Sequence, residues 1–140
     1  MKYVVDSSVG FKWVLIENLS DKAHKLRQDY TDGKLDLLAP DVFPIEIAHA
    51  LTRAERQERI TPPESGILLA DVLKTLPKQS RSLPLLARAA EISSAMRIGV
   101  YDCLYVALAE KKKRRFITAD DRLIKNLHKD FPFIISLDSI

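Results

Sequence analysis

The segment that decides the fold is YDCLYVALAEKKKRRFITADDRL, residues 101–123. Its first part, Tyr101 to Glu110, is strongly apolar and predicts a helix, and the basic run Lys111 to Arg115 precedes the short apolar strand RFIT. The acids Asp120 and Asp121 follow that strand and suit the start of another helix, ADDRLIKNLHK. Helix, strand and helix in succession indicate an α/β fold.

The same alternation extends to the N-terminus. Lys2 to Val5 predicts a short strand that ends at Asp6, after which Ser7 or Ser8 can cap a helix. We expect this helix to carry the apolar residues Val9, Phe11, Trp13, Val14 and Leu15. A second helix is expected from Ser20 to Asp32, with Gly33 as its C-terminal stop, and then a brief strand, LDLLAP, closed by Pro40.

The middle and the C-terminal end continue in the same way. Helical periodicity runs from Asp41 to about Ile60 and again from Pro63 or Glu64 to about Leu76, and Pro77 ends the second helix. The polar segment KQSRS is expected to be a loop and SLPLL a strand or turn. A helix from about Leu85 to Arg97 is predicted to stop at Gly99, and FPFIISL predicts the last strand.

Four or five short strands that alternate with helices favour a parallel sheet covered on both faces. We expect residues 1–140 to form a single domain, because this length is typical of one. Right-handed crossovers place the carboxyl ends of parallel strands along one edge of the sheet, where ligands bind. The functional residues should therefore follow the strands.

Composition narrows the class of protein. With 140 residues, of which 46% are hydrophobic and 29% charged, the chain can bury a core without disulfides or a structural metal. The single cysteine, Cys103, excludes a disulfide framework and a cysteine zinc cluster, and favours a reducing cytoplasm. No apolar run is long enough for a membrane span, and Asp6 leaves no room for the apolar part of a signal peptide. The net charge of +3 permits a polyanionic partner without requiring one.

Four carboxylates stand where charge is costly or where a ligand would lie. Asp6 directly follows the first strand, and Asp120 follows the strand FIT after one alanine. Asp102 lies in the first turn of the most apolar helix, and Glu46, between two isoleucines, lies near the start of another. Each has an ordinary alternative: Asp6 and Asp102 suit helix starts, and a helical glutamate is commonly solvated.

If the four acids meet, each pair about 5 Å apart would repel by roughly 3 kcal/mol at an effective dielectric constant near 20. A cation would be required to hold them together. Oxygen ligands without histidine or thiolate favour Mg²⁺ or Mn²⁺ over zinc. One or two such ions could activate a water molecule and stabilise the leaving oxygen of a phosphodiester, without a covalent intermediate.

At these residues the chain resembles the PIN-domain nucleases and, among them, the VapC-type toxins of type II toxin-antitoxin pairs. The resemblance rests on the segments VVDSSV, PIEIAHAL, YDCLYVALAE and TADDRL in this order, and it spans essentially the whole chain. Cys103 stands where these domains commonly carry alanine after the third acid, a harmless small apolar change.

The resemblance implies an α/β/α sandwich and a Mg²⁺- or Mn²⁺-dependent endoribonuclease that acts on RNA. Its catalytic metal ligands would be Asp6, Glu46, Asp102 and Asp120. Ser7 and Thr118 match the hydroxyl positions that would orient these ligands, and Asp121 is expected to face solvent. The resemblance further implies a homodimer and a small antitoxin partner, for which apolar surface on the helices Asp41 to Ile60 and Pro63 to Leu76 could form the groove.

Other features favour ordinary structural roles. The basic run Lys111 to Arg115 suits a solvated helix end, whereas Arg53, Arg56 and Arg59 are better placed to follow a nucleic-acid backbone. Trp13, Tyr101 and Tyr105 could stack on unpaired bases but are more typical of a core. The three histidines, at positions 24, 49 and 128, show no ligand spacing.

Other function classes compete with a nuclease. A phosphoacceptor signalling domain would need a lysine at the end of the last strand, where Ile135, Ser136 and Leu137 stand. A haloacid-type phosphatase would need a second aspartate two residues after Asp6. The remaining alternative is a metal-binding interaction or RNA-processing module without a toxin role.

Overall fold

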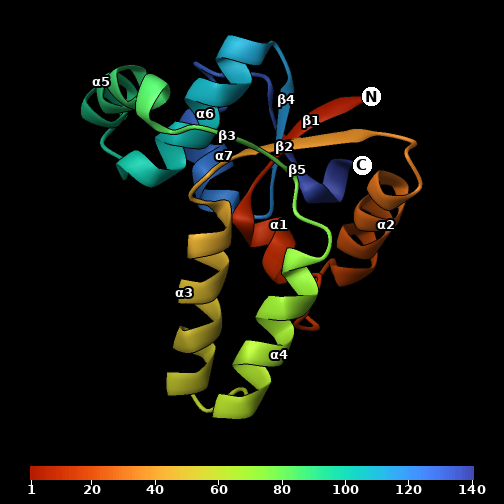
Figure 1. The fold of residues 1–140 in the computed structure, drawn as a ribbon. Coiled ribbons are helices and arrows are strands. Elements are labelled where there is room, and N and C mark those ends of the chain that lie inside the picture. Colours follow the sequence, from red (N-terminus) through yellow and green to blue (C-terminus); the bar gives the residue numbers. More distant parts are fainter.

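The computed structural model describes all residues from Met1 to Ile140. One five-stranded sheet forms in the order β3-β2-β1-β4-β5, and every neighbouring pair of strands is parallel. The strands are β1 (Lys2–Val5), β2 (Asp36–Pro40), β3 (Lys78–Ser80), β4 (Arg115–Thr118) and β5 (Ile134–Ser136). The predicted α/β fold with a short parallel sheet is confirmed (Figure 1).

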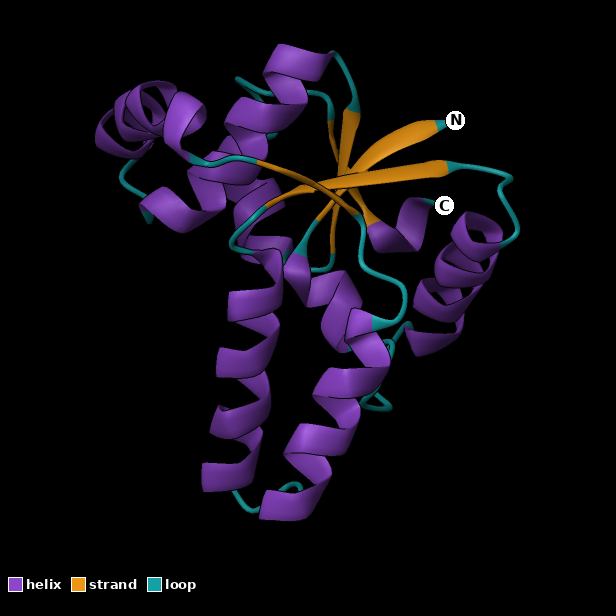
Figure 2. Ribbon diagram, viewed as in Figure 1, coloured by secondary structure: helices purple, strands orange, loops and turns teal.

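Helices cover the sheet on both sides. Figure 2 shows α5 and α6 on one side of the strands, α2 on the other, and α3 and α4 as an antiparallel pair that projects from the sheet. The helices are α1 (Ser7–Phe11), α2 (Ser20–Thr31), α3 (Phe43–Arg56), α4 (Pro62–Leu73), α5 (Leu86–Met96), α6 (Val100–Lys112) and α7 (Asp121–Leu127), with 3₁₀ turns at Leu83–Leu85 and Leu137–Ser139.

The core lies between α6 and the middle of the sheet. Every residue of α6 from Cys103 to Ala109 is buried, and this helix packs against β1, β2 and β4. The rings of Tyr105 and Phe116 stack with their centroids 5.5 Å apart. Because strands of a parallel sheet are buried on both faces, β1 and β4 are continuous apolar runs in which only the first residue is exposed.

The register of the central strands determines where the first acid lies. Val5 pairs with Ile117 across β1 and β4, and the backbone N–H of Asp6 donates to the carbonyl of Ile117 at 3.0 Å. Asp6 and Thr118 therefore leave the carboxyl ends of two adjacent strands side by side. At this point the strand order changes direction, and the crevice there is the usual ligand site of such sheets.

Two predicted elements near the ends of the sheet were wrong. The helix after Asp6 ends at Phe11, because the chain turns so that Trp13 buries its ring and donates its indole N–H to the carbonyl of Ala23 at 3.0 Å. The segment KQSRS is not wholly a loop, since Lys78–Ser80 pairs with β2 as an edge strand. A short polar edge strand has no apolar pattern to identify it.

Two turns also differ from the prediction. SLPLL contains a 3₁₀ turn, Leu83–Leu85, rather than a strand. Gly99 does not stop α5: Arg97 takes the left-handed conformation after that helix with φ of 60°, and Gly99 is extended as the N-cap of α6. The backbone of a residue other than glycine can adopt this conformation at a single position for a modest cost in free energy.

No single helix has both the length and the apolar character needed to cross a membrane. Only the segments Leu83–Met96 and Val100–Lys112 taken together reach that length, and they are bent by 118° relative to each other.

Candidate functional site

A polar cleft of about 500 Å³ lies at the carboxyl edge of the sheet. All four acids predicted as site residues line it: Asp6, Glu46, Asp102 and Asp120. Asp6 follows β1, Asp120 follows β4, and Glu46 and Asp102 lie in the first turns of α3 and α6. Four separate elements thus bring these side chains to one cleft.

The Asp6 carboxylate is the most deeply placed of the four. Its residue is only 5% exposed, and its Oδ2 accepts hydrogen bonds from the hydroxyls of Thr118 and Ser8, each at 2.7 Å. The Ser8 hydroxyl also accepts a hydrogen bond from the backbone N–H of Ala119 at 3.0 Å. The Thr118 hydroxyl accepts one from the backbone N–H of Asp120, also at 3.0 Å. These bonds fix Asp6 to the loop that carries the last acid.

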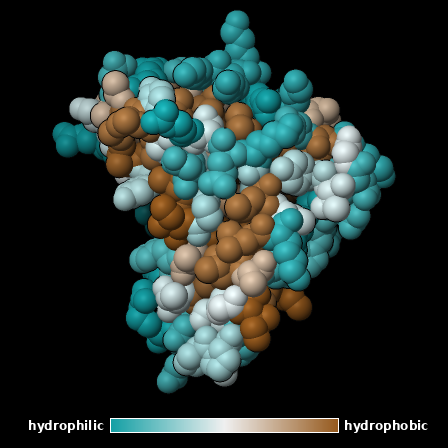
Figure 3. Space-filling model, viewed as in Figure 1, coloured by the Kyte–Doolittle hydropathy of each residue, from teal (hydrophilic) through white to brown (hydrophobic).

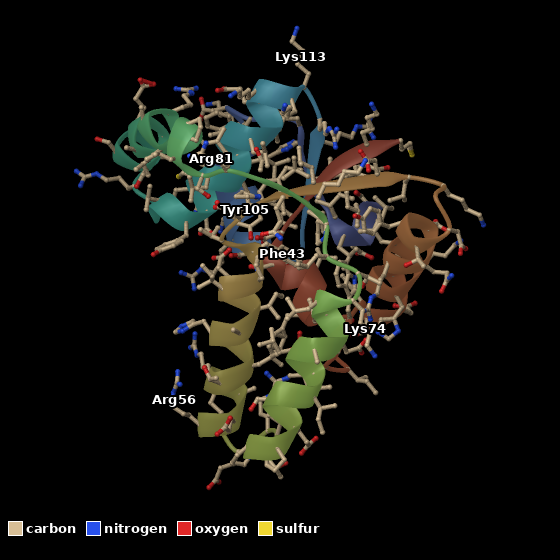
Figure 4. The ribbon with its side chains drawn as sticks, viewed as in Figure 1. Phe43, Arg56, Lys74, Arg81, Tyr105 and Lys113 are labelled. Atoms are coloured by element: carbon tan, nitrogen blue, oxygen red, sulfur yellow. The ribbon has the colours of Figure 1, made fainter.

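Glu46 is held by a buried aromatic residue. The hydroxyl of Tyr105 donates to Glu46 Oε1 at 2.7 Å, and Figure 4 shows Tyr105 in the interior near the start of α3. Tyr105 follows Asp102 by three residues, so both residues belong to the same turn of α6. The tyrosine therefore links the two helices that carry Glu46 and Asp102.

Asp120 combines two roles. Its Oδ1 accepts from the backbone N–H groups of Arg122 and Leu123, at 3.0 and 3.2 Å, so that it caps α7. The cap uses one carboxylate oxygen, and the residue also lines the cleft. The neighbouring Asp121 is exposed and lies outside the cleft, as predicted.

The cleft raises the pKa of three carboxyl groups, those of Asp6, Glu46 and Asp102. Burial, followed by the charges of Asp6 and Asp102, raises the pKa of Glu46 to about 7, although the Tyr105 hydrogen bond opposes the increase. Burial, followed by the charges of Asp6 and Asp120, raises the pKa of Asp102 to about 6. Burial also raises the pKa of Asp6 against the hydrogen bonds from Thr118 and Ser8. The negative charges are therefore brought together at a cost.

No cation of the chain neutralises these acids. None of the four takes part in a salt bridge. Lys12 and Arg59 also line the cleft, but both pair with Glu17, at 3.4 and 3.0 Å. Arg53 lines the cleft and has no paired acid.

The chemistry of the donors fits a hard divalent cation, because the four groups offer only carboxylate oxygens and lack a counter-charge. Their spacing is more open than in a closed metal site. No group of three or more Asp, Glu, His or Cys side chains is drawn together closely enough to hold a metal ion. A bound Mg²⁺ would thus keep several of its water ligands, as is usual for this ion. The predicted role of the four acids as metal ligands stays a prediction.

The remaining predicted residues lie either at the cleft or away from it. Ser7 lines the cleft, and Thr118 bonds Asp6 as described. The basic run Lys111 to Arg115 ends at the first residue of β4 and therefore lies at the opposite edge of the sheet from the cleft. Sequence reasoning treated Ser8 only as a helix cap and Tyr105 mainly as a core residue, so it missed both hydrogen bonds to the acids. The three-residue spacing from Asp102 to Tyr105 was the one available signal.

The comparison with known families agrees with this geometry. The family model of the PIN domain matches residues 3–129. The chain belongs to the PIN domain family. PIN domains are nucleases, which hydrolyse phosphodiester bonds. No curated protein matches the sequence significantly.

Two solved structures share the fold of this PIN domain. One is PAE2754 from Pyrobaculum aerophilum, with a TM-score of 0.72 and 21% identity over 99% of this chain and 94% of the other. Another is VapBC2 from Rickettsia felis, determined bound to a DNA fragment from its promoter, with a TM-score of 0.65 and 13% identity over 97% of both chains. At these identities the likeness concerns the fold alone.

Proposed function

We propose that residues 1–140 form a single nuclease domain that hydrolyses RNA internally with Mg²⁺ or Mn²⁺ as cofactor. The observation that carries the proposal is that four carboxylates, none of them paired with a cation, line one cleft of a PIN domain. Asp6, Glu46, Asp102 and Asp120 would hold the ion. When bound, it would supply a water nucleophile at neutral pH and stabilise charge on the leaving oxygen.

The residues of the chain contribute position and charge. The hydroxyls of Thr118 and Ser8 keep one oxygen of Asp6 engaged and leave Oδ1 without a hydrogen bond from another side chain. Tyr105 orients Glu46 in the same way through Oε1. Such supporting bonds reduce the freedom of a ligand and increase its affinity for a metal. Arg53, which forms no salt bridge, is placed to contact a substrate phosphate at the same cleft.

The test uses purified protein, unstructured and structured RNA, and either Mn²⁺ or EDTA. Cleavage should require the metal and should be lost in Asp6→Asn and Asp120→Asn. Asp121→Asn is a matched control, because it removes an adjacent carboxylate outside the cleft, and asparagine at position 120 can still cap α7. Full activity in EDTA, or equal activity in the Asp6→Asn and Asp121→Asn variants, would exclude the proposal.

We further propose that this nuclease is the toxin of a toxin-antitoxin module and acts as a homodimer in the cytoplasm. The fold shared with a VapBC2 complex supports this assignment. Figure 3 shows apolar surface over α3 and α4, where Ile45, Ile67 and Leu73 are exposed. An apolar helix of the antitoxin could bind there.

Expression of the chain should arrest growth, and co-expression with the adjacent reading frame should relieve the arrest. If the protein cleaves RNA but forms no complex with the neighbouring product, the toxin assignment fails and the nuclease assignment stands. The second candidate, an RNA-processing or metal-binding interaction module without a toxin role, would then be preferred.

A further inference from the structure

A second cavity adjoins the acid-lined cleft. It has a volume of about 390 Å³ and lies between the start of α6 and the exposed face of α7. Asp102 and Asp120 line both cavities, so these two acids form a ridge with a hollow on each side. A substrate chain that crosses the ridge would enter the second cavity.

The groups that line the second cavity are suited to an anion. Arg97 and Arg122 both contribute to its wall, both are exposed, and neither guanidinium forms a salt bridge or a hydrogen bond within the protein. The backbone N–H of Arg122 donates a hydrogen bond to Asp120 Oδ1. This bond fixes the backbone of Arg122, while its side chain stays free. Two unpaired arginines thus stand beside two unpaired acids without neutralising them.

The start of α6 adds backbone donors to the same cavity. Gly99 is the N-cap of this 13-residue helix and lines the cavity, and no side chain caps the helix there. The first N–H groups of an uncapped helix lack intrahelical partners and favour negative charge. A phosphate in this cavity would therefore meet two guanidinium groups and the positive end of a helix.

The main cleft differs in this respect. Two of its three cations, Lys12 and Arg59, are already paired with Glu17, so the cleft itself offers little free positive charge. The second cavity, on the far side of the ridge, has two unpaired cations. A substrate held only in the acid-lined cleft would have few charge-assisted contacts to compensate the repulsion between its phosphates and the acids.

We propose that the second cavity binds a backbone phosphate of single-stranded RNA next to the phosphodiester that is cleaved, with Arg97 and Arg122 as its ligands. This inference rests on the proposed nuclease function and specifies its substrate. The strand would lie across the Asp102–Asp120 ridge, with one phosphate on each side of it. The enzyme would then require at least one further nucleotide on the side of the second cavity for tight binding.

The test compares two double variants that remove the same charge. Arg97→Gln with Arg122→Gln empties the second cavity of cations. Lys34→Gln with Lys129→Gln is the control, because both side chains are exposed, form no salt bridge and line neither cavity. Thermal unfolding of both variants confirms that each is folded.

Affinity for a ten-nucleotide single-stranded RNA is measured by fluorescence anisotropy at several salt concentrations, in an Asp6→Asn background that does not cleave. The Arg97/Arg122 variant should bind on the order of tenfold more weakly, and its slope of log affinity against log salt should fall by about 1.4, since each lost contact with single-stranded nucleic acid contributes about 0.7. In the cleaving protein its KM should rise while kcat at saturating RNA stays unchanged.

Equal affinity and equal salt slope in the two double variants would overturn the second-cavity proposal. A wild-type protein that neither binds nor cleaves RNA would instead refute the proposed function itself, so the two failures are distinguishable. A loss of kcat without a change in KM would also contradict a role in binding the flanking phosphate.

Discussion

Replacing Glu46 by glutamine should stabilise the metal-free protein, and the effect should grow with pH. Burial and the charges of Asp6 and Asp102 raise the pKa of Glu46 from 4.5 to about 7. The folded state therefore binds more protons than the unfolded state between these values, and stability is lost as the pH rises through 7. Glutamine is neutral throughout and retains an oxygen that can accept the hydrogen bond from Tyr105.

The magnitude follows from the pKa. One pKa unit corresponds to about 1.4 kcal/mol, so raising the pKa of Glu46 from 4.5 to about 7 costs at most ~3 kcal/mol of unfolding free energy at high pH. Solvent screening reduces this value by about half, because the carboxylate lies in an open, partly solvated cleft. Most of the cost develops between pH 5 and pH 8, so the variant should gain roughly 1 to 1.5 kcal/mol over the wild type across this interval.

The assay is thermal or urea unfolding in EDTA at pH 5 and pH 8. For a domain of this size, the gain corresponds to a melting temperature about 3 to 5 °C higher for Glu46→Gln at pH 8, with a much smaller difference at pH 5. Saturating Mg²⁺ should reverse the order by stabilising the wild type more than the variant. Glu58→Gln, at an exposed residue outside the cleft, is the control. A difference between Glu46→Gln and wild type that is equal at both pH values would refute the reasoning.

Three further substitutions test a hydrogen bond that supports the site and the packing of the helices. Thr118→Val removes the hydroxyl that donates to Asp6 at 2.7 Å. The fold should stay intact, and calorimetric titration should show the affinity for Mn²⁺ reduced by about 10- to 100-fold. Unchanged affinity would contradict the supporting role of this bond. Gly10→Ala places a methyl group 2.5 Å from Cζ of Phe43, and urea unfolding should show a loss of about 1 to 3 kcal/mol in stability. In Gly66→Ala the new methyl group on α4 meets no atom within 4 Å, so this variant should be more stable by about 0.5 to 1 kcal/mol. If both alanine variants unfold alike, the close packing of α1 against α3 is not what limits position 10.

The central strands and the places of the acids could be predicted from the sequence because their signals are local. β1 and β4 are continuous apolar runs, since both faces of these strands are buried, and each is followed directly or after one residue by an aspartate. Parallel topology then brings Asp6 and Asp120 to the same edge without further information.

The features that could not be predicted depend on contacts distant in the sequence. β3 is polar and becomes a strand only because β2 supplies its hydrogen-bond partners. The bond from Tyr105 to Glu46 joins residues 59 positions apart, and burial of this tyrosine resembles that of any core residue. The pairing of Glu17 with Lys12 and Arg59, which leaves the cleft with little free positive charge, also depends on how α3 lies against the turn after α1.

The most direct test of the central claim is a crystal structure of the protein soaked in Mn²⁺ and measured at a wavelength where manganese scatters anomalously. The account predicts an anomalous peak in the cleft, within about 2.0 to 2.6 Å of Asp6 and at least one of Glu46, Asp102 and Asp120, with water completing the coordination. A cleft that stays free of anomalous density at millimolar Mn²⁺, or a peak coordinated by other residues, would contradict it.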